Sequence, residues 1–260
     1  MIKFFRKIRQ NLLSESKTGK YLKYVVGEIF LVVIGILIPL QINNWNENRK
    51  LKIEENQILQ NFKSSINRDL IYIKKAMNRY NDSKESINIL INYLQQDLPY
   101  KDSLSIHFGN INADWVLRID RSVFEALKSK GFSLISNDSL KQDIINFYSF
   151  AEYGLEDTSS KYSTILESAS ENIYGRHFDA LWEPVSREQQ ERYLDNNLDS
   201  EGIINKMTPR DFQALKLDHE FMYFLKSLRN RQFWLIRFPA KRIETELTSI
   251  LSRIEKELSE

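Results

Sequence analysis

The sequence predicts an all-α protein, in which a single N-terminal transmembrane helix is followed by an elongated antiparallel bundle of long helices. Three observations lead to this prediction. The chain of 260 residues has only 8 Gly and 5 Pro, too few turn formers for a sheet-rich fold with many tight turns. One stretch near the N-terminus, residues 29–40, has neither a charge nor a polar side chain. Beyond it, apolar residues recur every three or four positions, which is the period of an α-helix.

The basic residues cluster at the N-terminus. Residues 1–46 hold seven Lys or Arg against two Glu, whereas the remainder holds 30 basic against 33 acidic residues. Basic residues beside a membrane helix favour the cytoplasmic side. We therefore expect the tail, residues 1–20, in the cytoplasm and residues 46–260 outside it, with the chain in the cell (inner) membrane. Arg49, Lys50 and Lys52 count against this orientation.

Within the tail, residues 2–13 allow two interpretations. Their apolar residues fall near one face of a helix, with Lys and Arg elsewhere, as in an amphipathic helix on the inner leaflet. The alternative is a basic segment that only fixes the topology.

Residues 21–45 are predicted to span the lipid bilayer once. A helix of about 20 residues is about 30 Å long and matches the hydrocarbon core. Tyr21, Tyr24 and Trp45 lie at the ends of the segment, where interfacial aromatic residues belong. The alternatives are a cleaved signal peptide and a buried core helix. No small-x-small pair follows the apolar run, and a basic block precedes it, so we favour the membrane span.

Glu28 and Gly35 indicate a contact between membrane helices. They are seven residues apart, so two helical turns bring them to nearly the same face, and Gly27 lies close to it. A small residue lets another backbone approach, and a carboxyl group in apolar surroundings seeks a partner. We expect this face to contact a homodimer mate or a membrane partner protein. Alternatively, Glu28 reaches the headgroups near Lys20 and Lys23.

The domain over residues 46–260 is expected to begin with one long helix over about 46–96, continuous with the membrane helix. After a loop, a short helix is expected over residues 120–130, capped by Asp120 and stopped by Gly131.

Ser136-Asn137-Asp138-Ser139 is expected to open the next helix, where Ser139 with Gln142 matches a capping box, and its apolar stripe continues toward Leu181. Residues 184–208 are polar and irregular by pattern.

Two further helices complete the domain. Thr208 is expected to cap the first of them, with Pro209 at the first helical position. A long helical segment over residues 218–258 should be kinked or split by Pro239.

No catalytic, cofactor-binding or metal site emerges from the sequence. The chain has no Cys, and neither the glycine-rich phosphate-binding loops nor the Gly-x-Ser-x-Gly motif occurs. His107, His177 and His219 are isolated in sequence, and Asp218, His219 and Glu220 point in different directions on a helix. We therefore expect no enzyme activity, no cofactor and no metal.

Residues 229–242 form a basic, aromatic stretch with three interpretations. Binding of phosphates with aromatic stacking is one, and contact with lipid headgroups is another. The third is a bundle helix whose aromatic residues pack while Arg and Lys reach solvent. We favour the third and expect no nucleic acid, because nucleic-acid-binding domains normally carry a clear positive net charge.

Two segments carry a resemblance to a known family. The first combines the opening MIKFFRKIRQNLL with GEIFLVVIGILIPLQINNWNENRK over residues 27–50, and the second is SVFEALKSKGFSLISNDSLKQDIINFY over residues 122–148. Both resemble a family of single-pass membrane proteins known only as a domain of unknown function. Pro39 stands where the family leads us to expect Ala. The resemblance implies the topology and the helical domain and supplies no activity.

Two functional hypotheses follow. The first is a membrane-anchored helical domain that acts through protein interactions or as a structural support. The second is a sensor-like extracytoplasmic bundle that binds a small molecule and acts with a partner protein, which rests on fold-level analogy.

Overall fold

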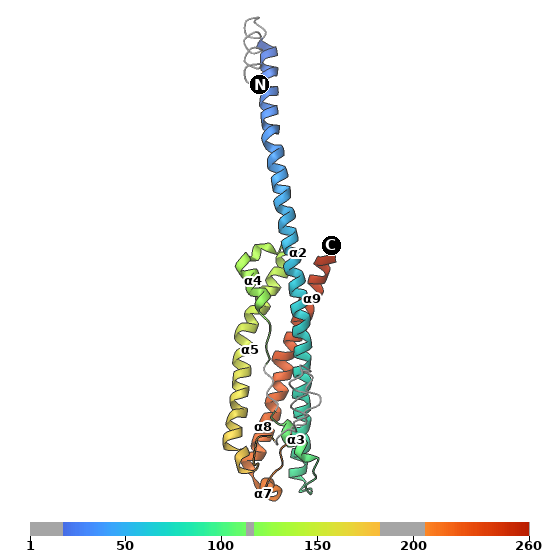
Figure 1. Ribbon diagram of the computed structural model, residues 1–260, viewed down its shortest axis with the longest axis vertical. Helices are drawn as coiled ribbons and strands as arrows, with labels where there is room; N and C mark the ends of the chain where they lie inside the picture. The colour runs from blue at the N-terminus through green and yellow to red at the C-terminus, as the bar shows by residue number, and fades with distance from the viewer. Residues whose placement is uncertain (1–17, 113–116, 183–205, 260) are drawn as a thin grey trace, which may run out of the picture. The chain divides into compact units, whose positions relative to one another are not determined.

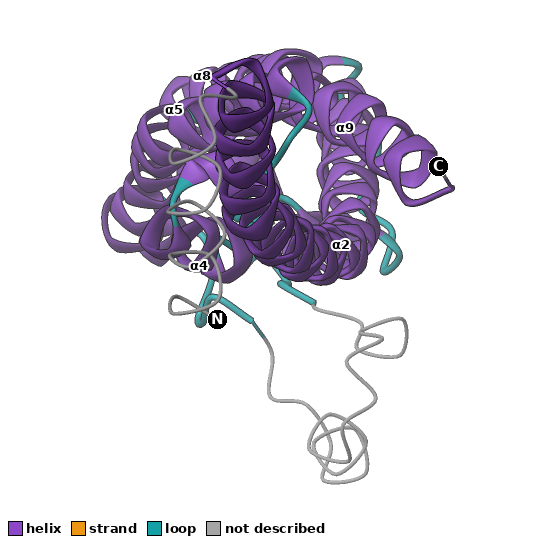
Figure 2. Ribbon diagram, turned by 90° about the horizontal axis from the view of Figure 1, so that it is seen from above, coloured by secondary structure: helices purple, strands orange, loops and turns teal. Residues whose placement is uncertain are grey.

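The computed structural model of the chain describes residues 18–112, 117–182 and 206–259. Contacts divide the chain into two compact units, Met1–Gln57 and Ile58–Glu260. Within the described residues every regular element is a helix, apart from one isolated bridge between Phe178 and Pro209 (Figures 1 and 2). The prediction of an all-α fold is confirmed.

The first unit contains the N-terminal part of helix α2, which runs from Thr18 to Gln95 and continues into the second unit. Between Val25 and Gln95 this helix includes an 18-residue window of mean hydropathy 2.5, none of it buried. By length and composition the helix is able to cross a membrane. Pro39 lies inside the helix without ending it. The amphipathic helix considered for residues 2–13 lies outside the described residues.

The second unit is built from the C-terminal part of α2 and a series of long and short helices. In chain order these are α3 (Leu104–Asn110), α4 (Ser122–Lys130), η1 (Phe132–Leu134), α5 (Asp138–Asn172), η2 (Tyr174–Arg176), α7 (Phe212–Leu217), α8 (His219–Leu235), η4 (Ile236–Ala240) and α9 (Lys241–Ser259). We expected a loop where α3 lies. The helix has only seven residues, too few to show a helical period in the sequence.

The long helices of the second unit do not all alternate in direction. Ring contacts join Phe62 to Tyr148 and, further along both helices, Tyr80 to Tyr162, so α2 and α5 run parallel. Helices α8 and α9 run against both (Figure 1), because Arg229 contacts Asn88 while Lys63 pairs with Glu255. Helices α8 and α9 are therefore antiparallel to α2 and α5, as predicted, whereas α2 and α5 are parallel to each other.

The connection between α2 and α4 explains the parallel pair. Ser83 on α2 donates to the Ile111 carbonyl, and Asp69, also on α2, accepts from the Asp120 amide. Fourteen helical residues separate Ser83 from Asp69, a rise of about 21 Å. Asp120, just before α4, is therefore held nearer the N-terminal end of α2 than Ile111, just after α3, and α5 follows in the same direction as α2.

The core lies between α2, α5 and the α8–α9 pair. Its largest fully buried side chains are Tyr80, Tyr148, Phe62, Phe108, Phe147, Phe221, Leu59, Ile66, Ile73, Ile87, Leu90 and Leu104. Each contributes roughly 1.5–3 kcal/mol relative to an exposed position. One polar network lies within this core. The fully buried Gln232 Nε2 donates to Ser83 Oγ at 2.7 Å and to Tyr162 Oη at 2.9 Å, which ties α8 to both other helices.

Two predicted helix ends are confirmed at residues with special backbone chemistry. Gly131 follows α4 with φ of 98°, a conformation that favours glycine, and its N–H bonds to the Leu127 carbonyl. Pro239 separates α8 from α9 by the five-residue π-helical turn η4. A wide turn suits proline, which lacks an N–H and collides with the carbonyl of an ordinary α-helical turn.

Three predicted helix starts or caps are wrong by a few residues, although α5 begins within the predicted opening. Helix α4 begins at Ser122, although Asp120 Oδ1 still accepts from the Ser122 amide at 2.9 Å. Helix α5 is capped by Asn137, which accepts from Leu140 N, and not by a capping box at Ser139. In each case several neighbouring residues are able to cap the helix, and the sequence does not show which of them does so.

The third wrong start precedes α7. The cap is Asp211, which accepts from Gln213 N and Ala214 N, whereas we expected Thr208. Pro209 lies instead in the bridge with Phe178. Most of the segment predicted to be irregular, residues 184–208, lies outside the described residues.

Candidate functional site

A pair of aspartates, Asp69 and Asp120, lies where α2 meets the start of α4. Asp69 is 6% exposed, and its Oδ1 accepts from the Asp120 amide at 3.2 Å. Asp120 Oδ2 accepts from Ser65 Oγ at 3.3 Å and lies 3.5 Å from the Arg68 guanidinium. Ser65 and Asp69 are one helical turn apart on α2, so a single face of that helix holds the segment before α4.

The two carboxyl groups differ in acidity. Burial raises the pKa of Asp69 to about 6, and the charge of Asp120 adds to this shift, while the Asp120 amide and Arg68 oppose it. Hydrogen bonds from Ser122, with smaller ones from Ser65 and Arg68, hold the pKa of Asp120 below its usual value. Asp120 is therefore ionised near neutral pH, whereas Asp69 takes up its proton at a higher pH than an ordinary carboxyl group.

Tyr148 packs beside this pair. Its ring stacks on Phe124 with centroids 4.8 Å apart, and its side chain is fully buried. Burial raises the pKa of Tyr148, and the nearby charges of Asp69 and Asp120 raise it further. Within the described residues, Tyr148 Oη and Asp69 Oδ2 are both buried without a hydrogen-bond partner. Asp69 is thus a buried proton-binding carboxyl group, whereas the side chain of Asp120 is 40% exposed.

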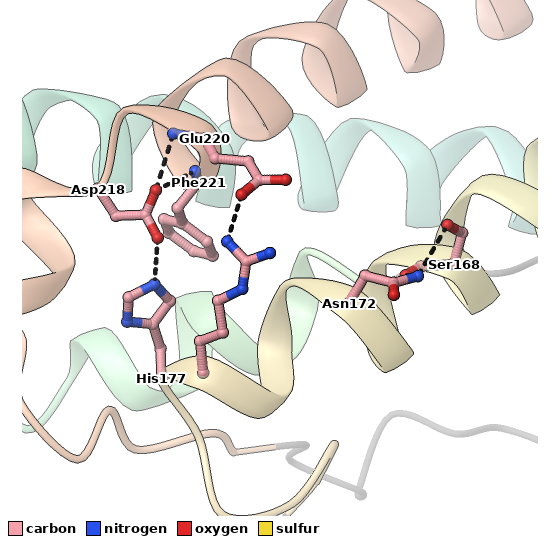
Figure 3. A network of polar contacts seen from close by, with 7 residues as sticks. Ser168, Asn172, His177, Asp218, Glu220 and Phe221 are labelled. Carbon is pink, nitrogen blue, oxygen red and sulfur yellow. Dashed lines mark hydrogen bonds and ion pairs between the residues drawn. The ribbon is translucent and has the colours of Figure 1, made fainter.

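A second polar network joins η2 to the start of α8 (Figure 3). His177 Nε2 lies 2.6 Å from Asp218 Oδ2, while Asp218 Oδ1 accepts from the amides of Glu220 and Phe221. Burial alone raises the pKa of Asp218, but hydrogen bonds from Phe221, His177 and Glu220 outweigh it and hold this pKa below its usual value. Arg176 pairs with Glu220 beside it.

This network stabilises one end of the bundle. His177 is 8% exposed, and its ring meets Phe221 edge to face at 5.7 Å. Because Asp218 is held ionised, His177 Nε2 carries the hydrogen in their contact. The pair resembles the base and orienting carboxylate of a hydrolase, but the burial of the imidazole leaves it little access to a substrate. Asp218 acts here as the helix cap of α8.

The basic, aromatic stretch over residues 229–242 differs from our interpretation. We expected its aromatic residues to pack, but Phe233 is 44% exposed, Trp234 62% and Phe238 64%. Arg231 and Arg237 are exposed beside them. We call these five residues the aromatic–arginine surface. The residues of α8 and η4 that pack inward are instead the aliphatic Leu235, Pro239 and Ala240 among others.

The three histidines do not meet. His107 Nδ1 lies 3.1 Å from Ser86 Oγ, His177 contacts Asp218, and His219 is the first residue of α8. Among the residues that the structure describes, no group of three or more His, Asp or Glu side chains is placed to hold a metal ion.

Sequence reasoning missed the carboxylate pair and the His177 network. The hydrogen-bonded partners lie 51 and 41 residues apart in the chain, so no local motif marks them. The only sequence signal was two Asp residues near helix starts. We interpreted Asp120 as a helix cap, and we considered Asp218 as a metal ligand and rejected it.

Comparison with known proteins gives one result. No curated protein and no solved structure matches the chain. The profile of a family of unknown function, DUF6090, matches residues 28–189, which is more than half of the sequence and includes the apolar run, α4 and α5. The resemblance to a domain of unknown function is thereby confirmed, although the opening segment MIKFFRKIRQNLL lies before the match. The chain belongs to the DUF6090 family.

Proposed function

We propose that the chain is a single-pass protein of the cell (inner) membrane, whose helical domain lies outside the cytoplasm and acts through contacts with other proteins. In this proposal it is not an enzyme. The observation that carries the anchor is the uncovered apolar window of α2, with mean hydropathy 2.5 and none of it buried. An apolar surface of that extent needs lipid or protein to cover it.

The size of the uncovered surface favours lipid. Each large apolar side chain gains roughly 1.5–3 kcal/mol on leaving water. The exposed large apolar residues in the expected span are Val26, Ile29, Phe30, Leu31, Val32, Val33, Ile36, Leu37, Ile38, Leu40, Ile42 and Trp45. They surround the helix on all sides, as expected of a membrane span and not of a one-sided docking face.

The orientation rests on the basic residues. Residues 1–46 carry the excess of Lys and Arg, which favours a cytoplasmic N-terminus. The apolar run continues without a helix break into the polar part of α2, and no small-x-small pair follows it. Both features support a retained anchor over a cleaved signal sequence.

Contact with proteins is favoured over binding of a small molecule. A groove of about 370 Å³ between α5 and α9 is lined by Asp143, Arg242 and Glu246, whose charges are already engaged. Asp143 pairs with Arg253, and Arg242 pairs with Glu246 at 2.7 Å. Ligand sites normally offer converging polar groups in an apolar cavity, and this groove offers ion pairs that are already satisfied.

The membrane helix itself presents a further contact face in this proposal. An added Cβ at Gly27 or Gly35 meets no atom within 4 Å, so another backbone is able to approach there. Together with Glu28, this face suits a homodimer or a membrane partner protein. The proposal involves no nucleic acid.

The anchor is tested by washing membranes that contain the full chain with alkaline carbonate. Val33→Arg with Ile36→Arg places two charges in the span, each costing about 2.5–3.5 kcal/mol near the bilayer centre. We expect wild type to resist the wash and this variant to be released. The matched control, Leu51→Arg with Ile53→Arg, changes residues that are equally exposed but lie beyond the span, and it should behave as wild type. Release of wild type by the wash would refute the anchor.

A further inference from the structure

The aromatic–arginine surface is an unusual concentration of large apolar side chains on the outside of the bundle. Phe233 and Trp234 lie edge to face with ring centroids 5.4 Å apart, and Phe238 follows one turn later. Single exposed apolar residues are normal on a protein surface. Three large aromatic residues within six positions, each more than 40% exposed, form a contiguous patch of the kind that marks an interaction site.

The π-helical turn η4 contains the C-terminal end of this patch. Pro239 and Ala240 are both buried inside the widened turn, whereas Arg237 and Phe238 just before them are exposed. The wide turn accommodates the proline and changes the rotation of the helix between α8 and α9. Turns of this type inside helices are frequent at functional sites.

The charged residues along this segment of the chain have one sign. Residues 221–243 contain six Lys or Arg and no Asp or Glu. Arg242 is engaged, because it pairs with Glu246 and lies 3.8 Å from the Phe150 ring centroid. By contrast, Arg231 and Arg237 form no hydrogen bond, ion pair or ring contact within the described part of the chain. Two exposed guanidinium groups without partners, next to three aromatic rings, call for an anionic and partly apolar ligand.

Three candidate occupants differ in how well they fit. A second copy joined by a two-fold axis would bring the arginines of both copies together, which is unfavourable. An anionic lipid surface suits an apolar stripe along a whole helix, but the exposed aromatic residues of this patch lie within positions 233–238. Trp and Arg are the residues that dominate protein–protein contacts, and acidic side chains complement the arginines.

We propose that the aromatic–arginine surface is the docking site for an acidic segment of a partner protein that carries aromatic or other apolar side chains. The partner's apolar groups cover Trp234 and Phe238, and its carboxylates pair with Arg231 and Arg237. This inference rests on the proposed function, in which the domain acts through protein contacts, and it assigns the chemistry of the partner.

The test measures binding of a fluorescein-labelled random copolymer of Glu and Tyr to the full chain in detergent micelles, by fluorescence anisotropy at low salt. We expect wild type to bind the copolymer. Trp234→Ala, and separately Arg231→Glu with Arg237→Glu, should each raise the dissociation constant at least about tenfold, as central residues of an interface do. These side chains are exposed, so the circular dichroism spectrum should not change.

Matched controls separate the patch from general exposure and charge. Tyr223→Ala removes another exposed aromatic residue of α8, and Lys74→Glu reverses an exposed charge on α2; both should bind as wild type. The proposal is overturned if wild type does not bind the copolymer or if the patch variants bind it equally well. It is also overturned if the patch variants lose binding only to a DNA duplex or to phosphatidylglycerol vesicles. Carbonate extraction of the same variants tests the anchor independently, since none of them alters the span.

Discussion

The buried carboxyl group of Asp69 makes a specific prediction about stability and pH. Its pKa is about 6 in the folded protein, against 3.8 in the unfolded chain. The folded state therefore holds this proton more tightly. The stabilisation from that proton is complete below the unfolded pKa and is lost as pH rises from about 4 to about 6. A shift of about two units corresponds to at most about 3 kcal/mol.

Asp69→Asn removes this dependence while keeping an oxygen that accepts from the Asp120 amide. We expect the variant to match wild type at about pH 4 and to exceed it by up to about 3 kcal/mol at about pH 7.5. The assay is urea denaturation of the full chain in a mild detergent, followed by circular dichroism over this pH range. The variant's advantage should grow with pH and level off once wild-type Asp69 is ionised.

Asp120→Asn is the matched comparison, because the ionised form of Asp120 stabilises the fold whereas that of Asp69 destabilises it. The pKa of Asp120 lies below its usual value, so its ionised form stabilises the fold above the unfolded pKa, and this contribution is lost as pH falls. This variant should lose about 1 kcal/mol at neutral pH, as when a helix cap is removed. If Asp69→Asn differs from wild type by the same amount at both ends of the pH range, the buried proton is not the cause and the reasoning fails.

Three further predictions concern other parts of the chain. Gln232→Leu should cost about 1–3 kcal/mol in urea denaturation, because Ser83 loses its buried donor; equal stability would remove the network from the account. Gly131→Ala should cost about 1 kcal/mol by the same assay, since a side chain is strained at φ of 98°, and an unchanged midpoint would argue against that conformation. Glu28→Gln and Gly35→Leu should each weaken self-association or partner association in a membrane-helix assay; if both associate as strongly as wild type, the segment is only an anchor.

Local backbone chemistry made part of the fold predictable. Gly131 and Pro239 end or interrupt helices because of their own conformational limits, so the sequence alone was enough to place them. The apolar stripes predicted the three long helical segments because their residues recur at the period of an α-helix. Asn137 and Asp211 were missed as caps because neighbouring residues are equally able to cap, and contacts with distant segments decide between them.

Long-range relations were not predictable. The parallel direction of α2 and α5 depends on where Ile111 and Asp120 are held along α2, which no periodicity encodes. The raised pKa of Asp69 depends on its burial in the folded protein and on Asp120, which is 51 residues away in the chain. By contrast, the outward position of Trp234 and Phe238 follows from the register of the buried Gln232, Leu235 and Pro239, which we did not use when we expected the aromatic residues to pack.

The most direct test of the central proposal is the location of the C-terminus. Alkaline phosphatase and a fluorescent protein are each fused after Glu260 in a bacterial host. A membrane-anchored domain outside the cytoplasm predicts an active phosphatase fusion and a dark fluorescent-protein fusion, both in the membrane fraction, because the basic residues hold the N-terminus inside. A fluorescent, phosphatase-negative pair would contradict this orientation, and fusions found only in the soluble fraction would contradict the anchor itself.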